Sequence, residues 1–329
     1  MQKFCLLTAA AKKLLSYSLK AAILVLAFAI IYRRVSNNDN LKQFEKLLSA
    51  IDHRRAWIVM TCVVLLMFTN WLTEALKWKY IARELSKMSN WEAVEAVFCG
   101  LTWAVFTPNR IGEYGGRVMF LPGRKRIHGV FAMAVGSFGQ NVITNTLGLA
   151  ALIWFMFTYL QLNIVISLSL TLAAVGFIIL LLIFYFNIGW LATLLNRIKY
   201  LKKYHRFFDI LDRYRTQELL NIMWFCMTRF FVFSFQYYLV IHLLMPEMPV
   251  FQMMMMVFIL FFIQSALPSL DLFDIVVRNY TATTFFVYIT TQNLAVMAAV
   301  SSIWFINLIV PAILGSVFVL KLRFFDRAS

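Results

Sequence analysis

Charged residues are scarce in this chain of 329 residues. They make up 14% of the sequence, whereas a soluble domain carries about 25%. Acidic residues are the scarcest, because 15 Asp and Glu stand against 31 Lys and Arg, which gives a formal net charge of +16. Hydrophobic residues account for 62% of the chain. This composition excludes a soluble globular protein and predicts an integral membrane protein.

Cysteine and histidine are also rare, with four of each in the chain. The sequence contains no Cys-x-x-Cys pair and no Cys/His spacing typical of a metal site. It also lacks a Walker loop, a dinucleotide-binding fingerprint and an ordered set of Ser, His and Asp. We therefore expect no metal, no cofactor and no enzymatic activity. A membrane enzyme with sparse motifs is kept as an alternative.

Basic residues gather between the apolar runs rather than on one solvated face. They lie at Lys12 and Lys13, at 124–126, throughout 197–215, and at Lys321, Arg323 and Arg327. This distribution follows the positive-inside rule, which places such loops in the cytoplasm. Anionic lipid, and not nucleic acid, is then the expected electrostatic partner. We predict a multi-pass protein of the cell inner (plasma) membrane, with the N- and C-termini in the cytoplasm.

Hydropathy predicts an all-α polytopic membrane protein that forms a single transmembrane bundle over residues 1–329. About six helices are long enough to cross a hydrocarbon core of roughly 30 Å. They are expected at 14–32, 57–76, 129–160, 163–190, 218–244 and 294–321. The first is interpreted as a retained anchor because no small-x-small cleavage site follows it. Residues 35–55 have the spacing of an amphipathic helix on the membrane surface.

Two further apolar segments stop at a proline. Segment 91–106 ends before Pro108, and segment 251–267 ends before Pro268. Basic residues on both flanks of 91–126 predict that this segment enters the membrane and returns as a re-entrant helical hairpin. For 251–289 two topologies are open, a second re-entrant hairpin from the outside or two full crossings.

A second re-entrant hairpin would make the halves 14–160 and 163–321 inverted copies of each other. Many transporters have this arrangement, with their binding sites at the interface between the repeats. The Lys and Arg residues within 33–55 oppose it, because they would then lie outside the cytoplasm.

The first proline opens a polar motif, Thr107-Pro-Asn-Arg-Ile-Gly-Glu-Tyr-Gly-Gly-Arg117. Pro108 breaks the incoming helix, and Gly112 permits a close approach of backbones at the hairpin tip. Glu113 and Arg117 are spaced i, i+4 and share one helix face. With Arg110 as a second donor, this segment is a candidate site for a phosphate or similar anion. A purely structural Glu113–Arg117 pair is the alternative.

The second proline opens a weaker copy of the first motif. Asp274 and Arg278 repeat the i, i+4 spacing after Pro268, and Asp271 is a candidate helix cap. The repeated order of Pro, acid and Arg predicts a polar site shared by the two halves. Charged residues flanked by such apolar sequence are costly, which favours a functional role.

Arg229 lies in the middle of the predicted span 218–244. An unpaired charge there costs at least about 2.5 kcal/mol, so Arg229 should face the interior, against Glu113, Asp271, Asp274 or a bound anion. A structural ion pair and an anion site are both open. Glu74 with Lys77 and Lys79 is expected to form a cluster at the membrane interface. The candidate substrate-binding residues are Arg110, Glu113, Arg117, Arg229, Asp271, Asp274 and Arg278.

The first motif, the long polar-to-apolar span after it and the later Leu267-Pro268 resemble the lysylphosphatidylglycerol synthase transmembrane-region family. Members share a Pro-x-x-x-Gly-Glu core like Pro108 to Glu113, and the resemblance covers nearly the whole chain. It implies a flippase-like domain that moves or accommodates lipid headgroups. Here it would stand alone, because the chain has no room for the aminoacyl-transferase domain. The segment 269–274 lacks the family's usual Gly-rich, Glu-bearing form, so the substrate is left open.

Taken together, these patterns predict a flippase-like membrane protein. It would bind and translocate an anionic phospholipid or a lipid-linked headgroup at a site between two re-entrant segments. Two other classes are kept as alternatives, an enzyme acting on lipid-linked substrates and a structural scaffold subunit. No nucleotide-binding motif is present, so energy would come from an ion gradient or from the lipid gradient itself.

Overall fold

The computed structural model describes residues 49, 52–105, 107, 110–190, 193–194, 210–267 and 274–319. Every element in this part of the chain is helical. Several predicted features lie outside the described residues: the anchor at 14–32, most of the surface helix at 35–55, Pro108, Pro268 and Asp271. The same holds for the basic C-terminal residues after 319.

Within the described residues, five helical runs are long and apolar enough to cross a membrane. They comprise α3 (His53–Ala82), α6 (Arg126–Tyr159) with the short η2 (Gly123–Lys125) before it, α7 (Ile164–Phe186), α10 (Thr216–Leu244), and the continuous run α13 (Asn293–Trp304), η5 (Phe305–Ile309) and α14 (Val310–Val319). These runs coincide with five of the predicted spans, and the remaining predicted span, at 14–32, is not described. The described part of the chain is therefore all-α, with the helices of a multi-pass membrane protein.

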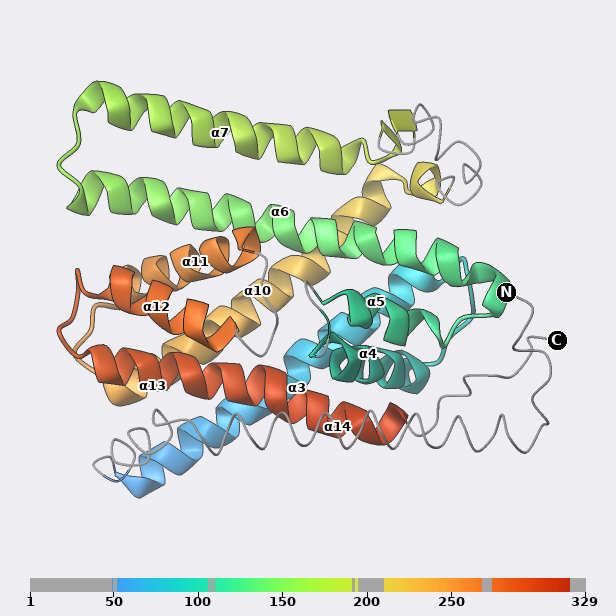
Figure 1. Cartoon of the computed structure of the whole chain (residues 1–329), viewed down its shortest axis with the longest axis horizontal. Helices are drawn as coiled ribbons and strands as arrows, with labels where there is room; N and C mark the ends of the chain where they lie inside the picture. Colours follow the sequence, from blue (N-terminus) through green and yellow to red (C-terminus); the bar gives the residue numbers. More distant parts are fainter. Residues whose placement is uncertain are drawn as a thin grey trace.

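Burial differs sharply between these helices. The most apolar stretch of α7 is only 6% buried, whereas that of the run Asn293–Val319 is 61% buried. In Figure 1, α7 lies at the edge of the molecule beside α6, and α13 and α14 extend along the bundle next to α4 and α12. Exposed apolar side chains such as Ile164 and Leu172 on α7 suit contact with lipid, because lipid tails replace the protein interior as their apolar surroundings.

Four shorter helices form two hairpins between the long ones. One consists of α4 (Asn90–Ala104) and α5 (Ile111–Val118), and the other of α11 (Val250–Ala266) and α12 (Asp274–Phe286). In Figure 1 the hairpins open toward opposite ends of the bundle, and the ends at which their helices join lie near each other in its middle. This arrangement brings together residues that flank Pro108 and residues that flank Pro268 in the sequence.

Position along α6 shows how far the second hairpin reaches. Thr144 on α6 lines the same cavity as Gln264 and Leu267 at the end of α11. At 1.5 Å per residue, Thr144 lies about 22 Å from the C-terminal end of α6 and about 27 Å from its N-terminal end. The α11–α12 hairpin therefore ends near the middle of a full-length helix.

The first hairpin is held together by glycines at which backbones touch. A Cβ added at Gly116 on α5 would lie 2.5 Å from Cα of Gly100 on α4. A Cβ added at Gly315 on α14 would lie 2.0 Å from the Phe98 carbonyl oxygen. Small residues permit such close packing of helices in membranes. As a result, α4 lies in direct backbone contact with α5 and α14.

Candidate functional site

Glu74 on α3 is the centre of a buried ion-pair network. Glu74 is 4% exposed, and its Oε1 accepts a hydrogen bond from Arg117 of α5 at 2.6 Å. Its Oε2 lies 2.8 Å from Nζ of Lys77, one turn further along α3, and also pairs with Arg229 of α10. One carboxylate thus joins cations from three helices.

The network extends through Arg117 and Arg229. Arg117 also pairs with Glu113 on its own helix, and Glu113 Oε2 lies 3.0 Å from Nε of Arg110. Arg229 donates from Nε to Oδ1 of Asn70 at 3.1 Å, and its guanidinium lies 5.3 Å from the centre of the Trp71 ring. We call the ionic part of this cluster the Glu74 network: Glu74, Lys77, Arg110, Glu113, Arg117 and Arg229.

The Glu74 network has an excess of positive charge. Among these described residues, four cations stand against two carboxylates. In surroundings of low dielectric constant such an imbalance is felt strongly, because charges interact much more strongly there than in water. A region of this kind attracts an anion.

The second motif contributes a separate pair. Asp274 begins α12 and pairs with Arg278 one turn later. The predicted i, i+4 pairs are therefore both formed, Glu113–Arg117 in one hairpin and Asp274–Arg278 in the other.

A cavity of about 590 Å³ lies where the two hairpins approach each other. This volume is within the range of roughly 300–1,000 Å³ that small-molecule pockets occupy. Its wall includes Arg110 at the start of α5, Arg229 on α10, and Asp274 and Arg278 on α12. Trp71 and Trp304 add aromatic surface. The cavity thus brings together charged residues from both motifs and from the middle of α10.

The polar half of α6 supplies another side of the cavity. Gln140, Asn141 and Thr144 line it, and Asn141 and Thr144, three residues apart, lie on one face of the helix. Ser137, one turn before Asn141, instead lies 3.1 Å from the Tyr114 hydroxyl, which donates to it. The polar stretch of α6 therefore serves both the cavity and its contact with α5.

Arg110 has an unusual backbone at the start of α5. Its φ of 57° makes it the one non-glycine residue with positive φ among the described residues. This left-handed conformation costs a residue with a side chain about 1 kcal/mol or more. Gly112 follows in a crowded position, where an added Cβ would lie 2.3 Å from the Trp103 carbonyl oxygen, and its N–H donates to Oγ1 of Thr107 at 2.7 Å. The turn therefore fixes where Arg110 enters the cavity.

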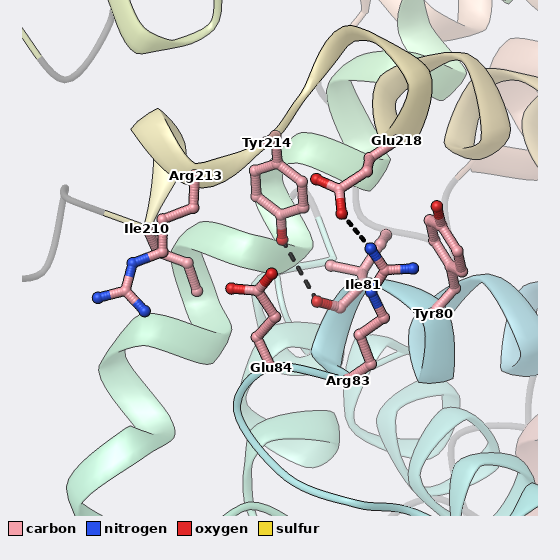
Figure 2. Close-up of a pocket in the computed structure, with 8 residues that line it drawn as sticks. All are labelled: Tyr80, Ile81, Arg83, Glu84, Ile210, Arg213, Tyr214 and Glu218. Atoms are coloured by element: carbon pink, nitrogen blue, oxygen red, sulfur yellow. Dashed lines mark hydrogen bonds and ion pairs between the residues drawn. The ribbon is translucent and has the colours of Figure 1, made fainter.

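A second, much smaller cavity lies at the end of α3 (Figure 2). Arg83 pairs with Glu218 there, and the Tyr214 hydroxyl donates to the Ile81 carbonyl oxygen at 3.3 Å. Burial raises the pKa of Tyr214 above its ordinary value, and the nearby carboxylates of Glu84 and Glu218 raise it further. The cavity volume is about 10 Å³, roughly enough for one water molecule. This cluster joins α3 to the loop before α10 and offers no room for a larger ligand.

Glu74 corrects one prediction and completes another. The prediction that Glu74, Lys77 and Lys79 form a cluster at the membrane interface is wrong. Glu74 and Lys77 are buried, and Lys79 instead donates to Oδ1 of Asn90 at 2.7 Å. Arg229 faces the interior as predicted, but its carboxylate partner is Glu74 and not Glu113 or Asp274. The signal available in the sequence was Asn70, which lies four residues before Glu74 on the same face of the span.

The predicted site residues fall into two groups in the structure. Arg110, Arg229, Asp274 and Arg278 line the cavity, while Glu113 and Arg117 lie behind its wall and connect Arg110 to Glu74. Among the described residues, no group of three or more His, Cys, Asp or Glu could hold a metal ion. Comparisons with protein-family models, curated proteins and solved structures found no match for this chain.

Proposed function

We propose that this chain is a flippase-like membrane protein whose cavity binds the headgroup of an anionic lipid. The observation that carries the proposal is the convergence of Arg110, Arg229 and Arg278 on one cavity, from three separate parts of the chain. Arginines are suited to phosphate because a guanidinium offers several donors in a fixed plane. A single carboxylate in the cavity wall, Asp274, leaves the described lining positively charged.

We further propose that both helical hairpins are re-entrant and enter the membrane from opposite sides. Supporting this, α11 ends beside the middle of α6 and the hairpins open toward opposite ends of the bundle in Figure 1. Such an arrangement matches the inverted halves 14–160 and 163–321, with the site at the interface between repeats. Irregular backbone at membrane depth is tolerated where it lines a polar cavity.

In this proposal the two carboxylates of the Glu74 network position the arginines. Glu74 holds Arg229 and Arg117, and Glu113 holds Arg117 and Arg110. A headgroup phosphate would contact Arg229, Arg278 and Arg110, and its acyl chains would remain in the lipid. Resemblance to the lysylphosphatidylglycerol synthase transmembrane-region family through the motif at 107–117 is part of the same proposal.

The proposal is tested by following lipid movement in reconstituted vesicles. A fluorescent phosphatidylglycerol in the inner leaflet becomes accessible to a membrane-impermeant quencher only when it is moved outward. We expect the intact protein to accelerate this exposure, and Arg229→Gln or Arg278→Gln to slow it by at least about tenfold, because a charge-assisted contact contributes roughly 1.5–3 kcal/mol.

Arg124→Gln is the matched control, because Arg124 is exposed in the turn before α6 and does not line the cavity. Equal rates for the intact protein and for Arg229→Gln would contradict the proposal. Chemical change of a labelled lipid, without movement, would favour the enzyme alternative. Loss of a co-purifying protein from the variants, with unchanged lipid movement, would favour the scaffold alternative.

A further inference from the structure

The cavity wall contains far more neutral polar groups than a phosphate needs. Beside the arginines and Asp274, seven side chains with amide or hydroxyl groups line it: Asn70, Gln140, Asn141, Thr144, Gln264, Ser265 and Asn307. They come from α3, α6, α11 and η5. An ionised phosphodiester only accepts hydrogen bonds, so it makes no use of the amide oxygens. These groups therefore indicate that the same ligand also carries hydrogen-bond donors, which a phosphodiester lacks.

Three of the amides keep a polar atom without a hydrogen-bond partner among the described residues. The atoms are Oε1 of Gln140, Nε2 of Gln264 and Oδ1 of Asn307. Gln140 donates from its nitrogen to the Cys226 carbonyl at 3.4 Å, and Asn307 donates to the Ile303 carbonyl at 3.2 Å. The amide oxygen is thus the unpaired atom in both. Two acceptors and one donor are in need of partners.

These atoms are buried in the wall, so a ligand reaches them when the terminal amide turns toward the cavity. That torsion is soft in Asn and Gln. The hydrogen bond that holds the Gln140 nitrogen is long at 3.4 Å, and that of Asn307, at 3.2 Å, lies at the upper end of the usual range. Leaving a buried polar atom unpaired is costly, and such atoms call for an explanation where they gather in one place. A ligand that both donates and accepts would satisfy them.

Asn307 reaches the cavity through a local irregularity of its helix. Residues Phe305–Ile309 form a π-helical turn inside the otherwise α-helical run 293–319. π-helical turns are uncommon and occur frequently at functional sites. Trp304, Asn307 and Leu308 from this turn and its edge all line the cavity.

Hydroxyl groups fit these requirements better than an ammonium group does. An ammonium group only donates and carries positive charge, whereas three arginines and one carboxylate already line the described wall. A hydroxyl is neutral, and it donates to an amide oxygen while accepting from an amide nitrogen. Aromatic faces such as Trp71 and Trp304 also suit the C–H surfaces of a polyol.

Resting on the proposed function, we infer that the ligand of this cavity is a phosphodiester headgroup that carries free hydroxyl groups, such as a glycerol, an inositol or a sugar. The arginines bind the phosphate, and the amides of Gln140, Gln264 and Asn307 recognise the hydroxyl groups. Lipids with the same negative charge but no hydroxyl on the headgroup bind more weakly.

The test compares phosphatidylglycerol and phosphatidylinositol with phosphatidylpropanol, which has the same charge as phosphatidylglycerol and lacks its two headgroup hydroxyl groups. Each lipid competes with a fluorescent phosphatidylglycerol for the full chain in detergent micelles. We expect the hydroxylated lipids to bind at least about fivefold more tightly, since unpaired polar groups are costly. In Asn307→Leu this preference falls toward one, while the affinity for phosphatidylpropanol is unchanged, which also shows that the variant is folded.

Gln236→Leu is the matched control. Gln236 is a buried amide whose Oε1 also lacks a partner among the described residues, but it does not line the cavity. Its replacement should leave the preference for hydroxylated lipids intact.

The remaining outcomes separate this inference from the function on which it rests. Equal binding of phosphatidylglycerol and phosphatidylpropanol overturns hydroxyl recognition, and so does tighter binding of phosphatidylethanolamine than of phosphatidylglycerol. In either case the affinity for phosphatidylpropanol still shows whether the cavity binds an anionic lipid. Binding of none of the anionic lipids overturns both. Competition by soluble glycerophosphoglycerol as strong as that by the lipid would keep hydroxyl recognition and overturn the lipid as its source.

Discussion

Replacing Glu74 with Gln would leave Lys77, Arg117 and Arg229 around an uncharged amide. Breaking a buried ion pair from one side costs about 3–5 kcal/mol, because the remaining charges stay buried. We expect Glu74→Gln to lower the midpoint of thermal unfolding in detergent clearly, as followed by loss of monodisperse protein. Glu84→Gln, at an exposed position just beyond the same helix, should change the free energy of unfolding by less than about 0.5 kcal/mol. Equal midpoints for the two variants would contradict the central role of Glu74.

At this scale, local spacing predicted the pairs Glu113–Arg117 and Asp274–Arg278, because both partners lie on one helix. The partners of Arg229 were out of reach, since Glu74 precedes it by 155 residues and lies on another helix. Periodicity reports which residues share a face and says nothing about which faces meet. Lys77 and Lys79, which follow Glu74 closely, indicate a membrane interface, and this signal hides the buried position of Glu74.

Among the helices, backbone contact between α4 and α5 leads to a prediction with a control on the same helix. An added methyl group at Gly116 would meet the Gly100 backbone at 2.5 Å, whereas one at Gly115 would meet only the Trp103 ring, at 3.6 Å. We expect Gly116→Ala to destabilise the protein by about 1–3 kcal/mol through overpacking. Gly115→Ala should be neutral, or stabilising by up to about 1 kcal/mol because Ala favours helix. Thermal unfolding of the two variants in detergent measures the difference, and equal stability would show that the hairpin can separate there.

The long helices could be predicted from hydropathy, because an apolar run that spans a membrane must satisfy its own backbone hydrogen bonds, and a helix does so. All five predicted spans within the described residues are present as long helices. The π-helical turn at Phe305–Ile309 was not predicted, although the sequence places Pro311 two residues after it in the same helical run. A proline inside a helix clashes with the carbonyl group four residues earlier, here that of Asn307, and membrane helices accommodate such a proline by local π-helical adjustments.

For the whole molecule, the proposed topology predicts the side of the membrane at which each turn lies. In a variant lacking the native cysteines, Pro122→Cys in the turn before α6 should react with an impermeant thiol reagent only from the cytoplasm. Thr291→Cys, in the turn between α12 and α13, should react only from the opposite side. Gln161→Cys, between α6 and α7, is the control and should behave like Thr291→Cys. All three positions are exposed. Reaction of Thr291→Cys from the same side as Pro122→Cys would contradict hairpins entering from opposite sides.

Arg229 belongs to two systems at once, because it lines the cavity and is held by Glu74, which also holds Arg117 of the first hairpin. An anion that draws Arg229 toward the cavity competes with Glu74 for the same guanidinium. Binding in the cavity and the attachment of α5 to α3 are therefore thermodynamically linked. Because such linkage is reciprocal, any displacement of the first hairpin that frees Glu74 changes the affinity of the cavity by the same factor as the anion changes the displacement.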